Sequence, residues 1–220
     1  MKELEALKRR YEGRAPGLMG ARQNYAVLCP FVEVEGEVHL LFEVRAKGLR
    51  QEGEVCFPGG RVEEGESFER CALRETEEEL GIPPSEITVF GESDFQASQE
   101  KMLLRSFLGE VSPAGLARLR PAAAEVAEVF TVPLRFFRET DPEVYTYDLM
   151  AQLPEDFPYE AVGAKREGPW QGGRVSVPVW YYEGHVIWGL TGRIVKIFWE
   201  NKKRGRPSAA PALHYAADLP

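Results

Sequence analysis

One stretch of the sequence, residues 57–82, constrains the fold more strongly than any other, because a glycine-rich turn leads directly into a charged helix. The turn is Pro58-Gly59-Gly60, and the helical pattern after it ends at Leu80-Gly81, with two prolines just beyond. A glycine past the last turn, followed by proline, is a common helix stop. The pattern therefore predicts a tight turn followed by a helix that ends at residue 80.

This helix gathers acidic side chains on one side. At about 100° per residue, Glu75, Glu78 and Glu79 share a sector of roughly 100°. Cys71 and Ala72 occupy the same sector one turn earlier. Like charges at this spacing repel by about 0.2–0.5 kcal/mol per pair, so cations between them would stabilise the helix. An acidic run is most often only a solvated helix face, but carboxylates on a short arc also suit Mg²⁺ or Mn²⁺.

The complete string from the turn to the helix end is more specific than the acids alone. Its fixed positions are Gly60, Glu66, Arg74, Glu75, Glu78, Glu79, Gly81 and Ile82. It resembles the signature of the Nudix hydrolases, Gly-x5-Glu-x7-Arg-Glu-U-x-Glu-Glu-x-Gly-U, in which U is a bulky apolar residue. The one departure is Thr76 at the first U position, which we expect to affect packing more than chemistry. The sequence is therefore identified as a member of that family.

The resemblance implies metal-dependent hydrolysis of a diphosphate and gives each motif residue a role. The implied ligands of Mg²⁺ or Mn²⁺ are the carboxylates of Glu75, Glu78 and Glu79 and the carbonyl of Gly60. Arg74 lies on the wheel with Arg70 and Glu77, so we expect it to face away from the metal and to orient a carboxylate through a bidentate pair. Glu66 is expected to be a first-turn acid of the helix, with a structural rather than a catalytic role.

The sequence does not decide which residues are the general base and the phosphate-binding groups. Glu75 could hold the attacking water, and Glu125 or Glu128, outside the helix, is the alternative. Arg45 and Arg50 are candidates for binding the substrate phosphates, although surface arginines without a ligand fit the sequence equally well. The three histidines show no metal-ligand spacing and are given no role.

Substrate choice depends on segments that flank the signature. Three of them, residues 40–60, 125–134 and 186–192, are similar to segments of the coenzyme A pyrophosphatases. The resemblance implies cleavage of coenzyme A, or of an acyl derivative, to adenosine 3′,5′-bisphosphate and 4′-phosphopantetheine. The alternatives are a Nudix hydrolase of ADP-ribose, NADH or a modified nucleotide, and a Nudix-fold module that binds a nucleotide without cleaving it.

The charge balance argues against one class of partner. The 220 residues carry a net charge of −8, which disfavours broad nucleic-acid binding through a basic surface. A small nucleoside diphosphate substrate must then be received locally, by metal or arginine. The sequence has no run of about 20 apolar residues for a membrane span, no signal-peptide core near its start and no Cys-x-x-Cys pair among its three cysteines. We expect a cytoplasmic protein with free thiols, and a homodimer is compatible with the sequence.

Strand and helix patterns on both sides of the signature helix predict an α/β fold with a mixed sheet and helices on its faces; the resemblance sharpens this to the Nudix α/β/α sandwich. Strands are expected at residues 26–34, 38–44, 55–57, 87–95, 102–111, 125–132, 143–152 and 174–182. Further helices are expected at 3–11, 134–139 and 185–200. The domain assignment is a helical extension at 1–21, the hydrolase domain at 22–200 and a flexible tail at 201–220. We expect Trp180, Trp188 and Trp199 in the core rather than stacked on adenine.

Overall fold

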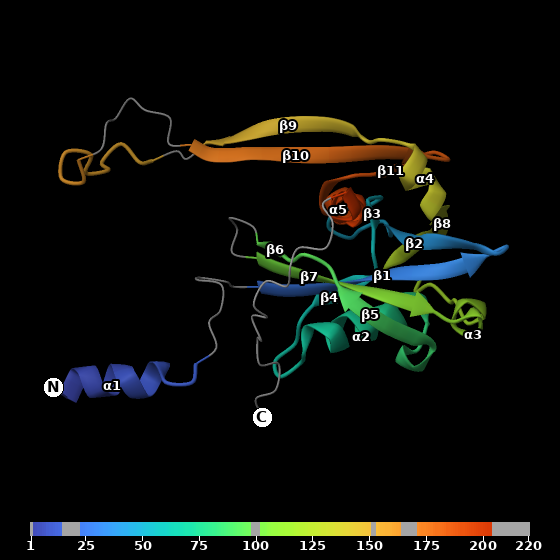
Figure 1. The fold of residues 1–220 in the computed structure, drawn as a ribbon, viewed down its shortest axis with the longest axis horizontal. Helices are drawn as coiled ribbons and strands as arrows, with labels where there is room; N and C mark the ends of the chain where they lie inside the picture. Colours follow the sequence, from blue (N-terminus) through green and yellow to red (C-terminus); the bar gives the residue numbers. More distant parts are fainter. Residues whose placement is uncertain (1, 15–22, 98–101, 151–152, 164–170, 204–220) are drawn as a thin grey trace.

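The computed structural model of this chain describes residues 2–14, 23–97, 102–150, 153–163 and 171–203. Within these residues, a mixed β-sheet carries a helix on each face, and a second, three-stranded sheet lies beyond one of the helices (Figure 1). The expected α/β/α arrangement is therefore confirmed. None of the helices in these ranges is both long and apolar enough to cross a membrane.

The central sheet is built around one parallel strand pair. Its eight strands are β1 (Gln23–Val34), β2 (Glu37–Arg45), β3 (Val55–Cys56), β4 (Gly59–Arg61), β5 (Ile87–Glu92), β6 (Gln96–Ala97), β7 (Met102–Val111) and β8 (Val126–Pro133). β1 and β7 are parallel, starting with Gln23 opposite Met102. The other pairs on the path β3-β2-β1-β7-β5 are antiparallel, and β4, β6 and β8 pair with β1, β7 and β2. β1 is thus central, and it anchors the short strand that carries the glycine turn.

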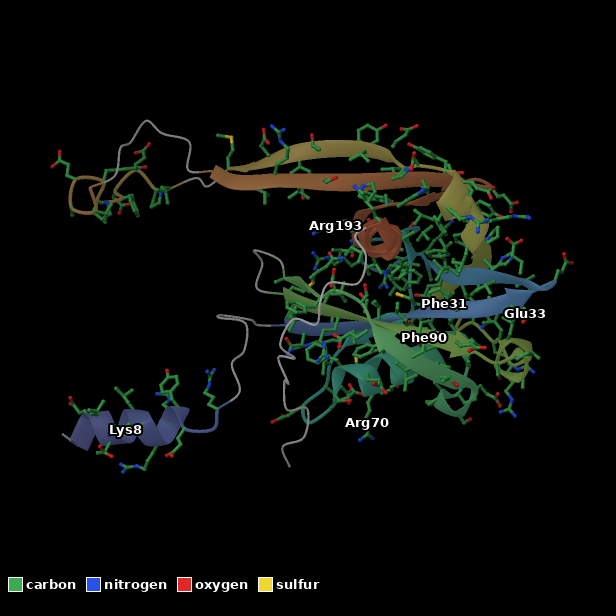
Figure 2. All side chains as sticks on the ribbon, viewed as in Figure 1. Lys8, Phe31, Glu33, Arg70, Phe90 and Arg193 are labelled. Carbon is green, nitrogen blue, oxygen red and sulfur yellow. The ribbon has the colours of Figure 1, made fainter. Side chains whose placement is uncertain are left out.

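Helix α2 (Phe68–Leu80) covers one face of this sheet. It begins after Ser67, whose hydroxyl accepts a backbone N–H of the first turn, and it ends at Gly81 in the left-handed conformation, as expected. Its buried side packs on β1, β2 and β7 in an apolar cluster that includes Ala26, Leu28, Leu41, Cys71, Ala72, Leu80 and Phe107. Figure 2 shows Arg70 projecting from the opposite side of α2, away from the sheet. The side of α2 that carries Arg70 is therefore exposed to solvent.

Helix α5 (Gly189–Lys203) and the second sheet cover the other face. That sheet contains β9 (Glu143–Met150), β10 (Gln171–Tyr182) and β11 (His185–Ile187), and α5 lies between it and the central sheet (Figure 1). Side chains from these layers form a second apolar cluster, which includes Leu40, Phe42, Phe57, Phe137, Trp180, Ile187 and Ile194. Trp180 is buried as expected, and its Nε1–H donates to the Thr140 carbonyl at 3.0 Å.

The closing helix starts later than the sequence predicts. Residues 185–187 form β11 instead, because a two-residue turn at Glu183-Gly184, with φ values of 47° and 87°, returns the chain alongside β10. This pairing buries Ile187 and leaves Trp188, which was expected in the core, 44 % exposed. The side chain of Trp199 lies outside the described residues.

The remaining elements are short or peripheral. They are α1 (Lys2–Tyr11), the 3₁₀ turn η1 (Pro84–Glu86), α3 (Pro113–Ala117) and α4 (Leu134–Glu139). The strand expected at 87–95 ends at Glu92, and the next strand beside β7 starts at Gln96. Helix α5 continues to Lys203, beyond the domain end expected at residue 200. The tail expected after it lies outside the described residues from position 204 onward.

Candidate active site

The glycine turn lies where β1 and α2 approach each other. A side chain on Gly59 would meet the Ala26 carbonyl oxygen at 2.3 Å. A side chain on Gly60 would meet the Glu75 carboxyl group at 2.4 Å. Both distances are too short for a Cβ atom. At Gly59 the obstacle is backbone, so only glycine fits, whereas a side chain at Gly60 would force the Glu75 carboxyl group to move. The turn thereby brings backbone directly against the acids of α2.

The three acids of α2 differ in burial although they share one side of the helix. Glu79 is 3 % exposed, and its carboxylate accepts the Gly59 N–H at 2.8 Å. Glu75 is partly buried, whereas the side chain of Glu78 is 56 % exposed. Burial, and after it the charge of Glu43, raises the pKa of Glu79; burial also raises the pKa of Glu75. The motif acids therefore extend from the sheet to the solvent.

Arg74 connects the motif acids. Its Nε and Nη2 donate to the two carboxylate oxygens of Glu66 at 2.9 and 3.1 Å, which is the expected bidentate arrangement. Its Nη1 lies 2.8 Å from a carboxylate oxygen of Glu75 and 3.0 Å from one of Glu78. Arg74 was expected to face away from the metal side of the helix, but its long side chain reaches back to Glu75 and Glu78. These hydrogen bonds lower the pKa of Glu66 and raise that of Arg74.

Glu66 is not a first-turn acid of α2, contrary to the expectation from the sequence. Ser67 caps the helix, so Glu66 precedes it. Its carboxylate accepts the Glu63 N–H at 3.1 Å as well as the guanidinium of Arg74. Glu66 therefore acts on the site indirectly, by fixing the arginine that contacts the acids of the helix.

A buried acid on the sheet, which the sequence did not single out, lies on the α2 side. Glu43 of β2 is 1 % exposed, and the Cys56 thiol of β3 donates to its Oε1 at 3.3 Å. Its Oε2 is buried and has no hydrogen-bond partner among the described residues. Burial is the main cause that raises the pKa of Glu43. The signal available in the sequence is one acid within the otherwise apolar run 40–44.

Together these side chains form an acid-rich site between β2 and α2. Burial is the largest cause of the raised pKa of Glu43, Glu75 and Glu79, and the charge of Glu125 raises each of them further. Such repulsion is relieved when a cation lies among the carboxylates. The donors are oxygens, and one of them is buried without a partner. This donor set fits a hard divalent cation such as Mg²⁺ or Mn²⁺.

The acids are held by groups of the protein itself. Within the part of the chain that the structure describes, no three His, Cys, Asp or Glu side chains already surround a common point. Arg74 engages Glu75 and Glu78. The Gly59 N–H engages Glu79. A cation that binds here would therefore compete with these donors for the carboxylate oxygens.

The two arginines considered for phosphate binding lie in different surroundings. Arg45 is partly buried beside the acids. Its charge lowers the pKa of both Glu43 and Cys56, but burial raises each pKa by more. Its Nε donates to the backbone carbonyl of Arg50 at 3.1 Å. The side chain of Arg50 is exposed on the loop that follows β2. The structure thus brings Arg45 to the edge of the site and leaves Arg50 on the surface.

The two glutamates considered as alternative bases lie in different places. Glu125 lies just before β8 and beside the end of β2, where its backbone carbonyl accepts the Ala46 N–H at 2.8 Å. Its charge raises the pKa of the acids of the site. Glu128 stands opposite Val44 in the β2–β8 ladder, on the face that packs toward α5. Its carboxylate lies 3.1 Å from Nε2 of His185, whose ring stacks on Phe130 at 3.7 Å. The geometry therefore favours Glu125 over Glu128 as a residue of the site.

Comparison with known proteins agrees with the signature. The sequence model of the NUDIX domain matches residues 22–149. The chain belongs to the Nudix family. The expected enzyme class, a hydrolase acting on a diphosphate bond, is confirmed with it.

Similar proteins include two named mitochondrial coenzyme A diphosphatase NUDT8. The protein of Mus musculus is 33 % identical over 177 residues, which cover 78 % of this chain and 74 % of the mouse protein. That of Homo sapiens is 31 % identical over 192 residues, which cover 86 % of this chain and 73 % of the human protein. The peroxisomal coenzyme A diphosphatase NUDT7 of Mus musculus is 35 % identical over 136 residues, covering 61 % of this chain and 56 % of that protein.

Proposed function

We propose that this Nudix hydrolase cleaves the diphosphate of coenzyme A, or of an acyl derivative, in a reaction that depends on Mg²⁺ or Mn²⁺. The products would be adenosine 3′,5′-bisphosphate and 4′-phosphopantetheine. The observation that carries the hydrolytic part is the acid-rich site, where carboxylates of α2 and β2 meet at the glycine turn. The substrate is supported by the flanking segments and by the relatives named as coenzyme A diphosphatases.

The residues proposed to hold the cation are those of the signature. They are Glu75, Glu78 and Glu79, through their carboxylates, and Gly60, through its carbonyl. When bound, a divalent cation neutralises charge on the diphosphate oxygens and lowers the pKa of a bound water. Arg74 and the Gly59 N–H contribute by fixing the orientation of the carboxylates, as groups that surround metal ligands commonly do.

Hydrolysis joins the oxygen of a water to one phosphorus and breaks the bond from that phosphorus to the bridging oxygen, which leaves with the other phosphate. The proton of the water passes to a carboxylate, for which Glu75 and Glu125 are the candidates. Arg45, at the edge of the site, would contact the negative oxygens of the substrate. The barrier falls through positioning and charge neutralisation rather than through a covalent enzyme intermediate.

The proposal is tested by incubating the purified protein with coenzyme A and Mg²⁺ or Mn²⁺, with and without EDTA, and separating the products by chromatography. We expect adenosine 3′,5′-bisphosphate to appear only with metal and to reappear when excess metal is added after EDTA. ADP-ribose and NADH are assayed in parallel. Turnover of one of these with coenzyme A untouched would contradict the substrate assignment, and turnover in EDTA would contradict the metal dependence.

A further inference from the structure

Glu43 occupies a position that apolar packing does not explain. Side chains along β2 alternate between the two faces of the sheet. Leu40 and Phe42 lie in the cluster beneath α5, and Leu41 lies in the cluster beneath α2. The alternation places Glu43 on the α2 side, where it is 1 % exposed. A carboxyl group at such a position opposes folding unless both oxygens find partners or its charge is neutralised.

Only one of the two carboxyl oxygens of Glu43 is satisfied. Glu43 and Cys56 are direct partners in the β2–β3 ladder, and the thiol donates to Oε1 at 3.3 Å. Oε2 is buried without a hydrogen-bond partner among the described residues. Buried polar atoms are rarely left unpaired in folded proteins, and each exception needs a cause. A role limited to holding Cys56 would involve Oε1 alone, so it leaves the second oxygen unexplained.

The surroundings of the unpartnered oxygen are those of the acid-rich site. β3 leads into the glycine turn, whose Gly59 N–H holds the carboxylate of Glu79. Glu43 is the ladder partner of Cys56, which lies three residues before Gly59. Glu125 lies beside the end of β2, where its backbone carbonyl accepts the Ala46 N–H at 2.8 Å. Carboxylates from β2, from α2 and from the segment before β8 therefore converge on one region.

We propose that Glu43 is a further carboxylate ligand of the divalent cation and approaches it from the sheet side of the site. The inference rests on the proposed metal-dependent function and adds a ligand that lies outside the helix signature. The cation would then have oxygen donors from both β2 and α2, which suits a hard ion of this class. The Cys56 thiol orients the carboxyl group by binding Oε1, so that Oε2 is the oxygen left for the cation.

Direct binding of Mn²⁺ tests this proposal independently of turnover. Free Mn²⁺ is measured by electron paramagnetic resonance during titration of the full-length wild type and of Glu43→Gln, Glu43→Asp and Glu37→Gln. Glu37 lies at the other end of β2 and pairs with Arg135 at 3.3 Å, so Glu37→Gln is a matched control for the loss of one acid. Circular dichroism and thermal melting without metal show whether each variant is folded.

We expect Glu43→Gln to weaken Mn²⁺ binding about tenfold or more and Glu37→Gln to change it less than about twofold. Glu43→Asp keeps the charge but withdraws the oxygen by one methylene, so it should also weaken binding. Wild-type affinity in Glu43→Asp beside a loss in Glu43→Gln would reduce Glu43 to a long-range charge and overturn the proposal. Unchanged affinity in Glu43→Gln would overturn it directly; if that variant does not fold, Glu43→Asp decides in the same way.

The same titrations separate this inference from the proposed function. If the wild type binds no Mn²⁺, the metal dependence proposed for the enzyme fails, and the role of Glu43 fails with it. If the wild type binds Mn²⁺ and hydrolyses coenzyme A while Glu43→Gln binds the ion equally well, only the role of Glu43 is lost.

Discussion

The two faces of the central sheet are built from the same strands but differ in chemistry. On the α5 side, the ring of Phe42 stacks on Phe57 at 4.8 Å and on Phe130 at 5.5 Å between ring centroids. On the α2 side, one residue further along β2, Glu43 is buried, and so is Glu79 of the helix. Because successive side chains of a strand point to opposite faces, a step of one residue separates an aromatic core from an acid-rich site.

Both faces carry an apolar cluster, but among the described residues the two buried acids lie on the α2 side. Burying one phenylalanine side chain contributes about 1.5–3 kcal/mol, so the α5 side supports the fold without any ligand. Buried carboxylates on the α2 side oppose folding until they are protonated or neutralised. Proteins tolerate such locally unfavourable choices mainly at functional sites. The α2 side should therefore respond to cations and pH, and the α5 side should not.

The largest effect is expected from a substitution of Glu79, the most buried of the three acids of α2 on the site. Glu79→Gln retains an oxygen that can accept the Gly59 N–H but removes the negative charge. We expect coenzyme A turnover with Mg²⁺ to fall at least about a hundredfold, roughly 2.7 kcal/mol of transition-state stabilisation. The metal-free variant should melt at a higher temperature than the wild type, because a buried ionisable group has been removed. Steady-state kinetics and thermal melting measure the two effects.

The matched control for this variant is Glu77→Gln, since Glu77 is exposed on the same helix. It should leave turnover within about twofold and the melting temperature almost unchanged. Wild-type turnover in Glu79→Gln would show that the α2 side is not the active site, and the contrast between the faces would then be one of packing alone.

A smaller effect is expected from two acids near β8 that lie in different surroundings. Glu125→Gln should lower turnover about tenfold or more, because the charge of Glu125 acts on the acids of the site and its carboxylate is a candidate base. Glu128→Gln should change turnover less than about twofold, because Glu128 contacts His185 on the α5 side. The same assay measures both. A larger loss in Glu128→Gln would reverse the assignment of the site to the α2 side.

The fold around the signature could be predicted because its signals are local. Gly81 ends α2 as the sequence predicts, since a left-handed residue after the last turn is a local requirement that glycine meets best. The start of α5 could not be predicted, because Val186 and Ile187 suit a strand as well as a helix. The turn at Glu183-Gly184 decides between the two by returning the chain to β10.

Only the part of the candidate site that lies on a single helix could be predicted from the sequence. A wheel places Glu75, Glu78 and Glu79 on one side, but their unequal burial depends on how the sheet packs against α2. The helical wheel misplaces the guanidinium of Arg74, because a wheel gives the direction of the Cα–Cβ bond and not the reach of a long side chain. Glu43 lies outside any helix motif, and its surroundings are created by β3 and α2, which are distant from β2 in sequence.

The smallest expected effect is a pH dependence of stability in the metal-free protein. Burial raises the pKa of Glu43 and Glu79. Above the ordinary glutamate pKa of about 4.3 and below the raised native value, the folded state holds protons that the unfolded state has released. Stability then falls as the pH rises through this range. From about pH 5 to about pH 8 we expect the free energy of unfolding, measured with urea, to decrease by at least about 1 kcal/mol.

Between about pH 5 and about pH 8, the change in the free energy of unfolding reports on the buried acids, so variants on the two faces of the sheet can be compared. The lowered pKa of Glu66 adds stability that is lost only as the pH falls below about 4.3, outside the range measured. Glu79→Gln should flatten the dependence, whereas Phe42→Leu on the α5 side should lower stability equally at both ends. Mg²⁺ should oppose the trend, because cation binding displaces the protons. If the metal-free wild type were equally stable at both ends, the acids would be neutralised within the protein, and the proposed difference between the two faces would disappear.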